Sequence, residues 1–152
     1  MEDRYKSLLV VDLMLIRKNN EKDEVLLALR KNTGYNDGNF ELPGGHVEAE
    51  EDLMQAMIRE AKEELGIKLK REDLKIAHIL HRYKANRLNF IVSACNYEGT
   101  LKIGEPDKCE KLEWFDLKNL PDNIEEKSRK VLKEIEKGFL YDNGDFINLQ
   151  EN

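Results

Sequence analysis

Apolar and polar positions at the start of the chain predict two strands joined by a hairpin. Residues 7–16, SLLVVDLMLI, form an apolar run broken only by Asp12. A run of that length with β-branched residues is more typical of a buried strand than of a helix. Residues 24–30, EVLLALR, predict a second strand, and the polar stretch RKNNEKDE predicts the turn that connects them.

The following segment, residues 31–45, is rich in turn-forming residues. Its sequence, KNTGYNDGNFELPGG, combines glycines, asparagines, an aspartate and a proline with one apolar stretch. That stretch, FEL at residues 40–42, predicts a short strand. Long ordered loops often carry function, so we expect binding or reactive groups in this segment.

A helix is predicted from residue 50 or 51 to Gly66, because glycine is common just past a helix C-terminus. At about 100° per residue, one side of this helix is apolar and faces the core. Gln55, Arg59 and Lys62 lie roughly opposite, toward solvent. The apolar side consists of Met54, Met57, Ile58, Ala61 and Leu65.

The second half of the chain predicts three more strands and a second helix. The strands cover residues 73–84, 87–99 and 109–117, and the helix covers residues 122–140. Strands interleaved with helices predict an α/β fold, with a mixed sheet between helices. The predicted buried set of the second helix is Ile124, Val131, Leu132, Ile135 and Phe139.

Composition narrows the classes of function. A chain of 152 residues fits one domain, residues 1–152, with a core of its own. Its net charge of -6 argues against a nonspecific binder of nucleic acid or anionic membranes. A small phosphorylated ligand stays open, because a metal ion reverses the local sign of charge. Cys95 and Cys109 lack metal-ligand spacing, and without a recognisable signal peptide or membrane span we expect a cytoplasmic protein.

Three carboxylates crowd the end of the first predicted helix. Glu60, Glu63 and Glu64 are helical neighbours, and like charges at this spacing cost a few tenths of a kcal/mol per pair. The helix dipole also disfavours negative charge there. Arg59 compensates Glu63 at i,i+4 but leaves the other two uncompensated. A solvated acidic face is the simple alternative, but a divalent cation such as Mg²⁺ or Mn²⁺, completed by a phosphorylated ligand, removes the conflict.

The same stretch resembles the Nudix box. Gly45, HVEAE, Glu51, DLMQAMI, Arg59-Glu60, Ala61-Lys62, Glu63-Glu64 and Leu65-Gly66-Ile67 match every fixed position of that pattern. Ala61 is smaller than the bulky aliphatic residue of the strict pattern. The box covers 23 of the 152 residues, and the flanking LPGG and LEWFDL segments resemble the MutT-like branch of the family.

The resemblance implies a Nudix fold, an α/β/α sandwich around a mixed sheet, and hydrolysis of a nucleoside diphosphate linked to a group X. It also implies that Glu60, Glu63, Glu64 and the carbonyl of Gly44 bind Mg²⁺, with Mn²⁺ as a substitute. One of these glutamates would help to activate water. Arg59 would pair with Glu51 to fix the geometry of the helix.

Outside the box, Glu105 and then Glu110 are candidates for a further metal ligand or general base, although either acid alone fits an ordinary loop equally well. Gly45 permits close approach of a phosphate. Tyr35 and Phe40 are candidate contacts to a base, although packing or turn roles are more common for such residues.

We expect a small nucleotide as the binding partner, and neither a membrane nor a nucleic acid. The sequence leaves open whether the protein forms a homodimer. A nucleoside triphosphate is the first expectation for the substrate. Nucleotide sugars, ADP-ribose, dinucleoside polyphosphates and a capped RNA end are alternatives. Two other interpretations compete: a nucleotide sensor without turnover, which would be free to lose the box glutamates, and an acidic interaction helix without metal.

Overall fold

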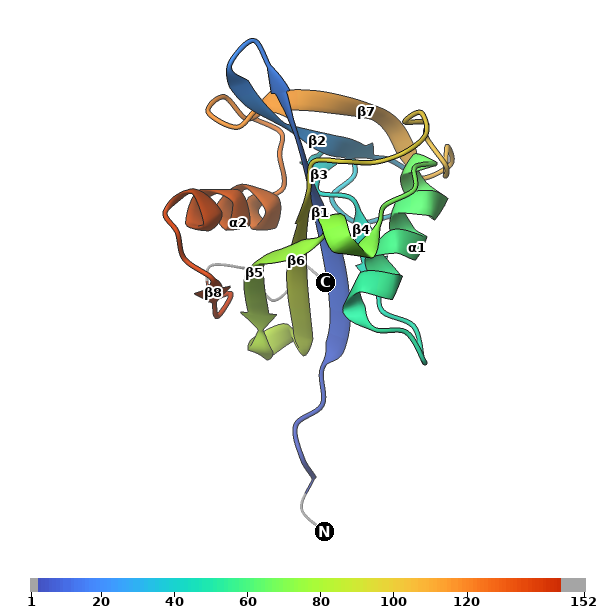
Figure 1. Cartoon of the computed structure of the whole chain (residues 1–152). Helices are drawn as coiled ribbons and strands as arrows, with labels where there is room; N and C mark the ends of the chain where they lie inside the picture. The colour runs from blue at the N-terminus through green and yellow to red at the C-terminus, as the bar shows by residue number, and fades with distance from the viewer. Residues whose placement is uncertain (1–2, 146–152) are drawn as a thin grey trace.

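Eight strands and two α-helices form the part of the chain that the computed structural model describes, residues 3–145 (Figure 1). The helices are α1 (Leu53–Leu65) and α2 (Glu126–Glu136). The strands are β1 (Leu8–Asn19), β2 (Lys22–Arg30), β3 (Phe40–Glu41), β4 (Gly44–His46), β5 (Lys75–Arg82), β6 (Arg87–Ala94), β7 (Cys109–Asp116) and β8 (Tyr141–Asp142).

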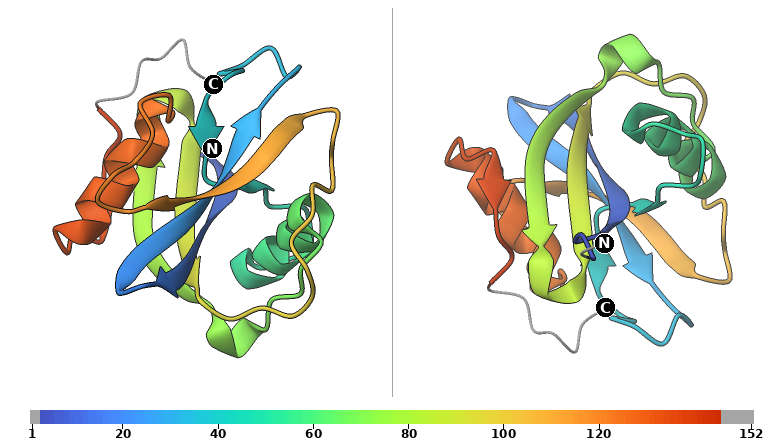
Figure 2. Two further views of the ribbon diagram at one scale, coloured as in Figure 1. Left: turned by 90° about the horizontal axis from the view of Figure 1, so that it is seen from above. Right: turned by 90° about the horizontal axis from the view of Figure 1, so that it is seen from below.

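The strands build one mixed sheet in the order β3-β2-β1-β6-β5-β8, with β4 also paired to β1 and β7 to β2. β1 runs parallel to β6 and antiparallel to β2 and β4. The two helices cover opposite faces of this sheet, as both views in Figure 2 show. The predicted α/β/α sandwich is therefore confirmed. No helix within residues 3–145 is long and apolar enough to cross a membrane.

β1 is central and buried on both faces, which explains its continuous apolar run. Val11, Leu13 and Leu15 pack into the cluster that includes α1. Met14, between them, packs into the cluster that includes α2. Because side chains alternate along a strand, one strand supplies both cores.

α1 begins at Leu53, slightly later than the sequence predicted. The Asp52 side chain caps it by accepting a hydrogen bond from the Gln55 backbone amide, and the Asp52 backbone amide donates one to Gln55 Oε1, at 2.8 Å each. Glu50 has a φ of 66°, which excludes it from the helix. At the other end Gly66 adopts a φ of 68°, as the predicted C-terminal glycine should.

α2 is shorter than the predicted helix 122–140, and two members of its predicted buried set lie outside it. Ile124 is buried but precedes the helix. Phe139 is 55% exposed, so its predicted burial is wrong. The physical reason is that the helix ends at Glu136 and Gly138 turns the chain with a φ of 84°. The chain then adds β8 to the sheet beside β5.

The glycines that the sequence assigned to a loop form β4, which lies against β1. Gly44 pairs with Asp12, and a Cβ at Gly44 would lie 2.0 Å from the Val11 carbonyl oxygen. Only glycine allows this approach. The pairing fixes the Gly44–His46 backbone beside α1 and so defines one wall of the site.

Candidate active site

The last turns of α1 present three carboxylates to one region of the surface. The Glu60 side chain is 12% exposed and that of Glu63 is 49% exposed. Glu64 is half-buried, facing β4. Within about one turn, α1 therefore carries one exposed acid, Glu63, and two half-buried acids, Glu60 and Glu64.

The helical periodicity predicted that Arg59 faces solvent. Its guanidinium instead lies among these acids. Arg59 donates two hydrogen bonds to Glu51, from Nη2 to Oε1 at 2.7 Å and from Nε to Oε2 at 3.1 Å. Its Nη1 donates to Glu60 at 2.9 Å and to Glu63 at 3.2 Å, so Glu60 is compensated, contrary to expectation. Nη2 also donates to the His46 carbonyl at 3.0 Å, which ties β4 to the helix.

Glu64 has a different environment from its neighbours. Its Oε2 accepts a hydrogen bond from the Gly44 amide at 3.2 Å. Burial, followed by repulsion from the carboxylates of Glu60, Glu41 and Glu105, raises the pKa of Glu64 to about 9. At neutral pH this carboxyl holds a proton unless a positive charge arrives.

Glu60 rests directly on the backbone of β4. A Cβ at Gly45 would lie 2.3 Å from Glu60 Oε1, so this glycine makes room for the carboxylate. Burial raises the pKa of Glu60, the contact with Arg59 lowers it, and Glu63 and Glu105 raise it further. The contact of Gly45 with a substrate stays a prediction.

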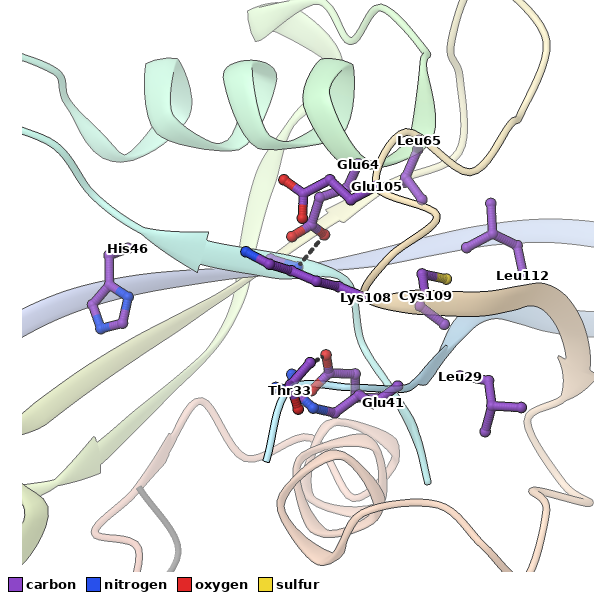
Figure 3. A pocket seen from close by; sticks show the side chains of 13 residues that line it. Leu29, Thr33, Glu41, His46, Glu64, Leu65, Glu105, Lys108, Cys109 and Leu112 are labelled. Atoms are coloured by element: carbon purple, nitrogen blue, oxygen red, sulfur yellow. Dashed lines mark hydrogen bonds and ion pairs between the residues drawn. The ribbon is translucent and has the colours of Figure 1, made fainter. Parts of the chain in front are cut away.

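The loop before β7 brings a fourth carboxylate to the same place. Glu105 and Glu64 project side by side into a cavity of about 330 Å³ between α1, β3 and β4 (Figure 3). We call Glu60, Glu63, Glu64 and Glu105 the acidic cluster. Glu110, the second candidate, is exposed on β7 and does not line this cavity. The polar side chains that line it are Arg30, Thr33, Glu41, His46, Glu64, Glu105 and Lys108, with Cys109 beside them.

Glu41 was not selected from the sequence, yet it forms part of the cavity wall. Arg30 Nη1 donates to its Oε1 at 2.6 Å. Burial and the nearby Glu125 raise the pKa of Glu41 to about 7, although Arg30 lowers it. The alternation of the FEL stretch was the available signal, because Phe40 and Leu42 face the core and Glu41 faces the other way.

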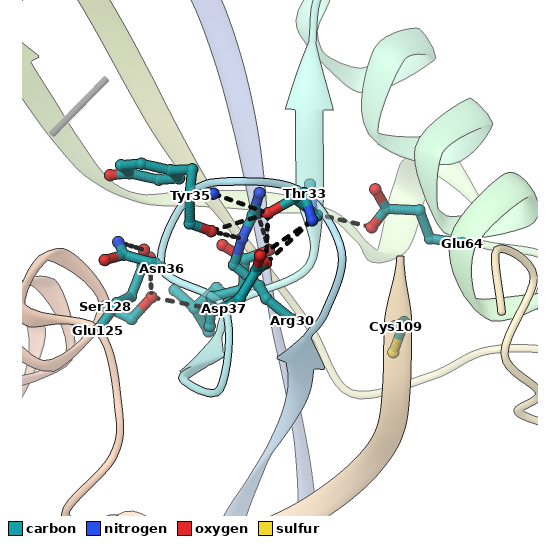
Figure 4. A network of polar contacts seen from close by, with 12 residues as sticks. Arg30, Thr33, Tyr35, Asn36, Asp37, Glu64, Cys109, Glu125 and Ser128 are labelled. Carbon is teal, nitrogen blue, oxygen red and sulfur yellow. Dashed lines mark hydrogen bonds and ion pairs between the residues drawn. The ribbon is translucent and has the colours of Figure 1, made fainter. Parts of the chain in front are cut away.

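The loop of residues 31–39 is ordered by its own polar contacts (Figure 4). Asp37 accepts hydrogen bonds from the Thr33 hydroxyl at 2.6 Å and the Gly34 amide at 2.9 Å. Arg30 donates to the Tyr35 carbonyl at 2.7 Å and lies over the Tyr35 ring. The half-buried Tyr35 is next to the cavity but does not line it, so its contact with a base stays a prediction.

Phe40 is a core residue rather than a substrate contact, which corrects the expectation from the sequence. It is 4% exposed, and its ring packs edge-on against Phe115 with centroids 4.8 Å apart. A ring enclosed in this way has no free face on which a base can stack.

The acidic cluster fits a divalent cation by the chemistry of its donors. Carboxylate oxygens are the ligands that Mg²⁺ and Mn²⁺ prefer, and a bound cation would offset the repulsion of Glu64 by Glu60, Glu41 and Glu105. Within residues 3–145, however, no three His, Cys, Asp or Glu side chains are already arranged to hold an ion. Glu60 and Glu63 instead point to Arg59, so binding requires them to turn.

Comparison with known sequences gives a match over most of the chain. A model of the NUDIX domain family matches residues 8–135. An ADP-ribose pyrophosphatase of Methanocaldococcus jannaschii is 36% identical over 109 residues. The match covers 66% of this chain and 60% of that protein, so the chain spans less than two thirds of this curated relative.

Solved structures share the fold. A MutT NUDIX hydrolase from Burkholderia pseudomallei is 28% identical with a TM-score of 0.73, covering 84% of this chain and 97% of the other. A bifunctional NMN adenylyltransferase/ADP ribose pyrophosphatase from Francisella tularensis, complexed with AMP and a Mn ion, is 20% identical with a TM-score of 0.64. That match covers 90% of this chain and 43% of the other.

Proposed function

The chain belongs to the NUDIX domain family, and from this premise we propose that it hydrolyses the pyrophosphate bond of a nucleoside diphosphate linked to a further group. The observation that carries the proposal is the acidic cluster around the half-buried Glu64, beside a cavity that also offers Arg30 and Lys108. Carboxylates that repel one another are unfavourable. A bound cation offsets this repulsion and in turn attracts an anionic ligand.

In this proposal Glu60, Glu63 and Glu64 hold Mg²⁺, or Mn²⁺ in its place, with the Gly44 carbonyl and Glu105 as further ligands. A divalent cation bound there offsets the negative charge of the pyrophosphate and acidifies water. Hydrolysis adds water across the P–O–P bond, so hydroxyl joins one phosphorus and the bridging oxygen leaves on the other. Glu105 is the candidate to take the proton of the water, because it lies in the cavity beside the helix acids.

The other side chains of the site orient these groups. Arg59 and Glu51 lock the helix to β4 through the His46 carbonyl. Lys108 and His46 line the cavity where the phosphates would lie, and Lys108 supplies a positive charge. Holding the reacting groups in place is the main contribution that a protein makes to phosphoryl transfer.

ADP-ribose is the first candidate substrate, because the relative that is 36% identical carries that name. A nucleoside triphosphate is the second candidate, favoured by the likeness to a MutT NUDIX hydrolase at 28% identity. Both contain a nucleoside diphosphate and differ only in the group beyond it. A sensor without turnover is less well supported, because Glu60, Glu63 and Glu64 are all present.

A panel of ADP-ribose, nucleoside triphosphates, nucleotide sugars and dinucleoside polyphosphates, each with Mg²⁺ or Mn²⁺, tests the proposal. Phosphorus NMR identifies the products, and labelled water shows which phosphorus is attacked. We expect turnover of at least one compound. Glu64→Gln should lower kcat by about 10³-fold, which corresponds to about 4 kcal/mol of lost transition-state stabilisation.

Glu126→Gln is the matched control, since it neutralises an exposed carboxylate in the first turn of α2, on the other side of the sheet. It should leave kcat unchanged. Full activity of Glu64→Gln would disprove the assigned site. Absence of turnover across the panel, with tight binding of one compound, would favour the sensor.

A further inference from the structure

We propose that Gly104 is a positioning residue, whose missing side chain lets the loop before β7 close onto the end of α1 and so places Glu105 in the acidic cluster. The inference deepens the proposed function and rests on it for the role of Glu105. It concerns a residue outside the helix and strands that build the rest of the site.

The segment between β6 and β7 follows the C-terminal end of α1 through backbone hydrogen bonds. The Lys102 amide donates to the Leu65 carbonyl at 3.0 Å, and the Gly104 amide donates to the Glu64 carbonyl at 2.9 Å. The last carbonyls of a helix lack partners within the helix. The loop therefore caps α1 and is held in a fixed position by it.

Gly104 is the point of closest approach. A Cβ at this position would lie 1.8 Å from the Glu63 carbonyl oxygen, far inside the contact distance of about 3.5 Å. The obstacle is helix backbone, which cannot rotate aside as a side chain can. Gly104 does not have a positive φ, so the lack of space, rather than an unusual backbone conformation, requires glycine here.

Glu105 follows directly and depends on this contact. Its carboxylate is close enough to raise the pKa of both Glu60 and Glu64, and it lines the cavity next to Glu64. Behind it, the Lys108 and Cys109 amides donate to the Glu105 carbonyl at 3.0 Å each, which turns the chain into β7. Any side chain at Gly104 must separate loop from helix, and Glu105 would move with the loop.

A double-mutant cycle tests the inference, using wild type, Gly104→Ala, Glu105→Gln and the double variant. For the substrate found by the panel, Gly104→Ala should lower kcat by about 10- to 100-fold with little change in KM, since displacements near 1 Å have effects of this size. Glu105→Gln should lower kcat similarly, and the double variant should be no slower than Glu105→Gln. Mn²⁺ affinity, titrated by electron paramagnetic resonance without substrate, should follow the same pattern.

The matched control is Gly138→Ala. This glycine has a φ of 84° with nothing within 4 Å of its would-be Cβ, so alanine strains the backbone without displacing the loop. We expect wild-type kcat and Mn²⁺ affinity. Lys102→Pro provides a second test, because it removes the amide that bonds to Leu65 and loosens the same loop.

Several outcomes would overturn the inference. One is a wild-type result for Gly104→Ala, and another is additive loss in the double variant, which would show that Gly104 acts independently of Glu105. Wild-type kcat and Mn²⁺ affinity in Glu105→Gln would show that Glu105 has no role in the site, so that Gly104 would have no functional group to position. Unfolding of both Gly104→Ala and Lys102→Pro would assign the loop to stability instead. If wild type turns over no compound, the proposed function fails, while the Mn²⁺ cycle still tests Gly104.

Discussion

Glu51, which precedes α1, and Arg59, in the middle of α1, are joined by two hydrogen bonds at 2.7 and 3.1 Å, although they are eight positions apart in the sequence. A carboxylate held by two guanidinium N–H groups combines strength with a defined orientation. The hydrogen bond from Arg59 lowers the pKa of Glu51, so this acid stays ionised. The pair links the loop after β4, the helix and, through the His46 carbonyl, the strand itself.

Arg59→Lys should therefore lower activity while preserving the charge. Lysine supplies a point charge and cannot hold Glu51, Glu60 and the His46 carbonyl together. We expect kcat to fall about 10- to 100-fold with a small change in Tm. Steady-state kinetics with saturating Mg²⁺ measures the effect, and Lys62→Arg on the exposed side of α1 is the control. Wild-type kcat in Arg59→Lys would show that charge alone is sufficient.

Glu64 should make the stability of the metal-free protein depend on pH. Its pKa of about 9 lies above the unfolded value near 4.5, so folding takes up a proton between these limits. The stabilisation is fully present below about pH 4.5 and is lost as pH rises toward about 9, with a slope of at most about 1.4 kcal/mol per pH unit. Urea unfolding in EDTA across this range measures the free energy of unfolding.

Glu41 titrates near pH 7, so its contribution ends before that of Glu64. Between about pH 7 and 9, Glu64→Gln should flatten the slope, whereas Glu41→Gln should keep a slope that ends at a lower pH, because it removes the repulsion from Glu41 that raises the pKa of Glu64. Mg²⁺ should raise the free energy of unfolding of wild type most at high pH, where the carboxylates that bind it are ionised. An unchanged slope in Glu64→Gln above pH 7 would contradict the assignment of the raised pKa.

Phe40→Leu should reduce stability without affecting catalysis. The residue packs against Phe115 in the core, so loss of the ring should cost about 1 kcal/mol in the free energy of unfolding while KM and kcat stay at wild-type values. Phe115→Leu is the matched control, from the other half of the same contact. A clear rise in KM for Phe40→Leu alone would restore the substrate contact that the sequence predicted.

Local patterns predicted the parts of the fold that depend on local physics. The apolar run that contains Val11, Leu13 and Met14 predicted a buried strand, and Gly66 ends α1 as a C-terminal glycine should. The predicted burial of Phe139 was wrong because the helical periodicity of the sequence continues beyond Gly138, whereas the backbone turns there.

The site was predictable where one helix carries it and less so where distant segments meet. Glu60, Glu63 and Glu64 share a turn, so their spacing alone brings them together. Glu41 and Lys108 reach the cavity only through the pairing of β2 with β3 and β7, which no single stretch of sequence specifies. Glu105 was proposed from its acidic loop, but the contact of Gly104 with Glu63 that holds it is tertiary.

Gly44 and Gly45 are adjacent, yet alanine should affect them differently. At Gly44 the new Cβ meets β1 backbone, 2.0 Å from the Val11 carbonyl oxygen, which cannot move without separating β4 from β1. Gly44→Ala should therefore destabilise the fold by about 1 to 3 kcal/mol and lose activity as well. Urea unfolding measures this loss.

At Gly45 the Cβ meets only the end of the Glu60 side chain, 2.3 Å from Oε1, and that side chain can rotate away. Gly45→Ala should keep the wild-type free energy of unfolding but lower kcat by about 10- to 100-fold, because Glu60 leaves its place in the acidic cluster. Mn²⁺ affinity should fall as well, since a displaced carboxylate no longer contributes a ligand. Equal loss of stability in both variants would show that β4 tolerates neither substitution as a strand, and that Glu60 has no separate dependence on Gly45.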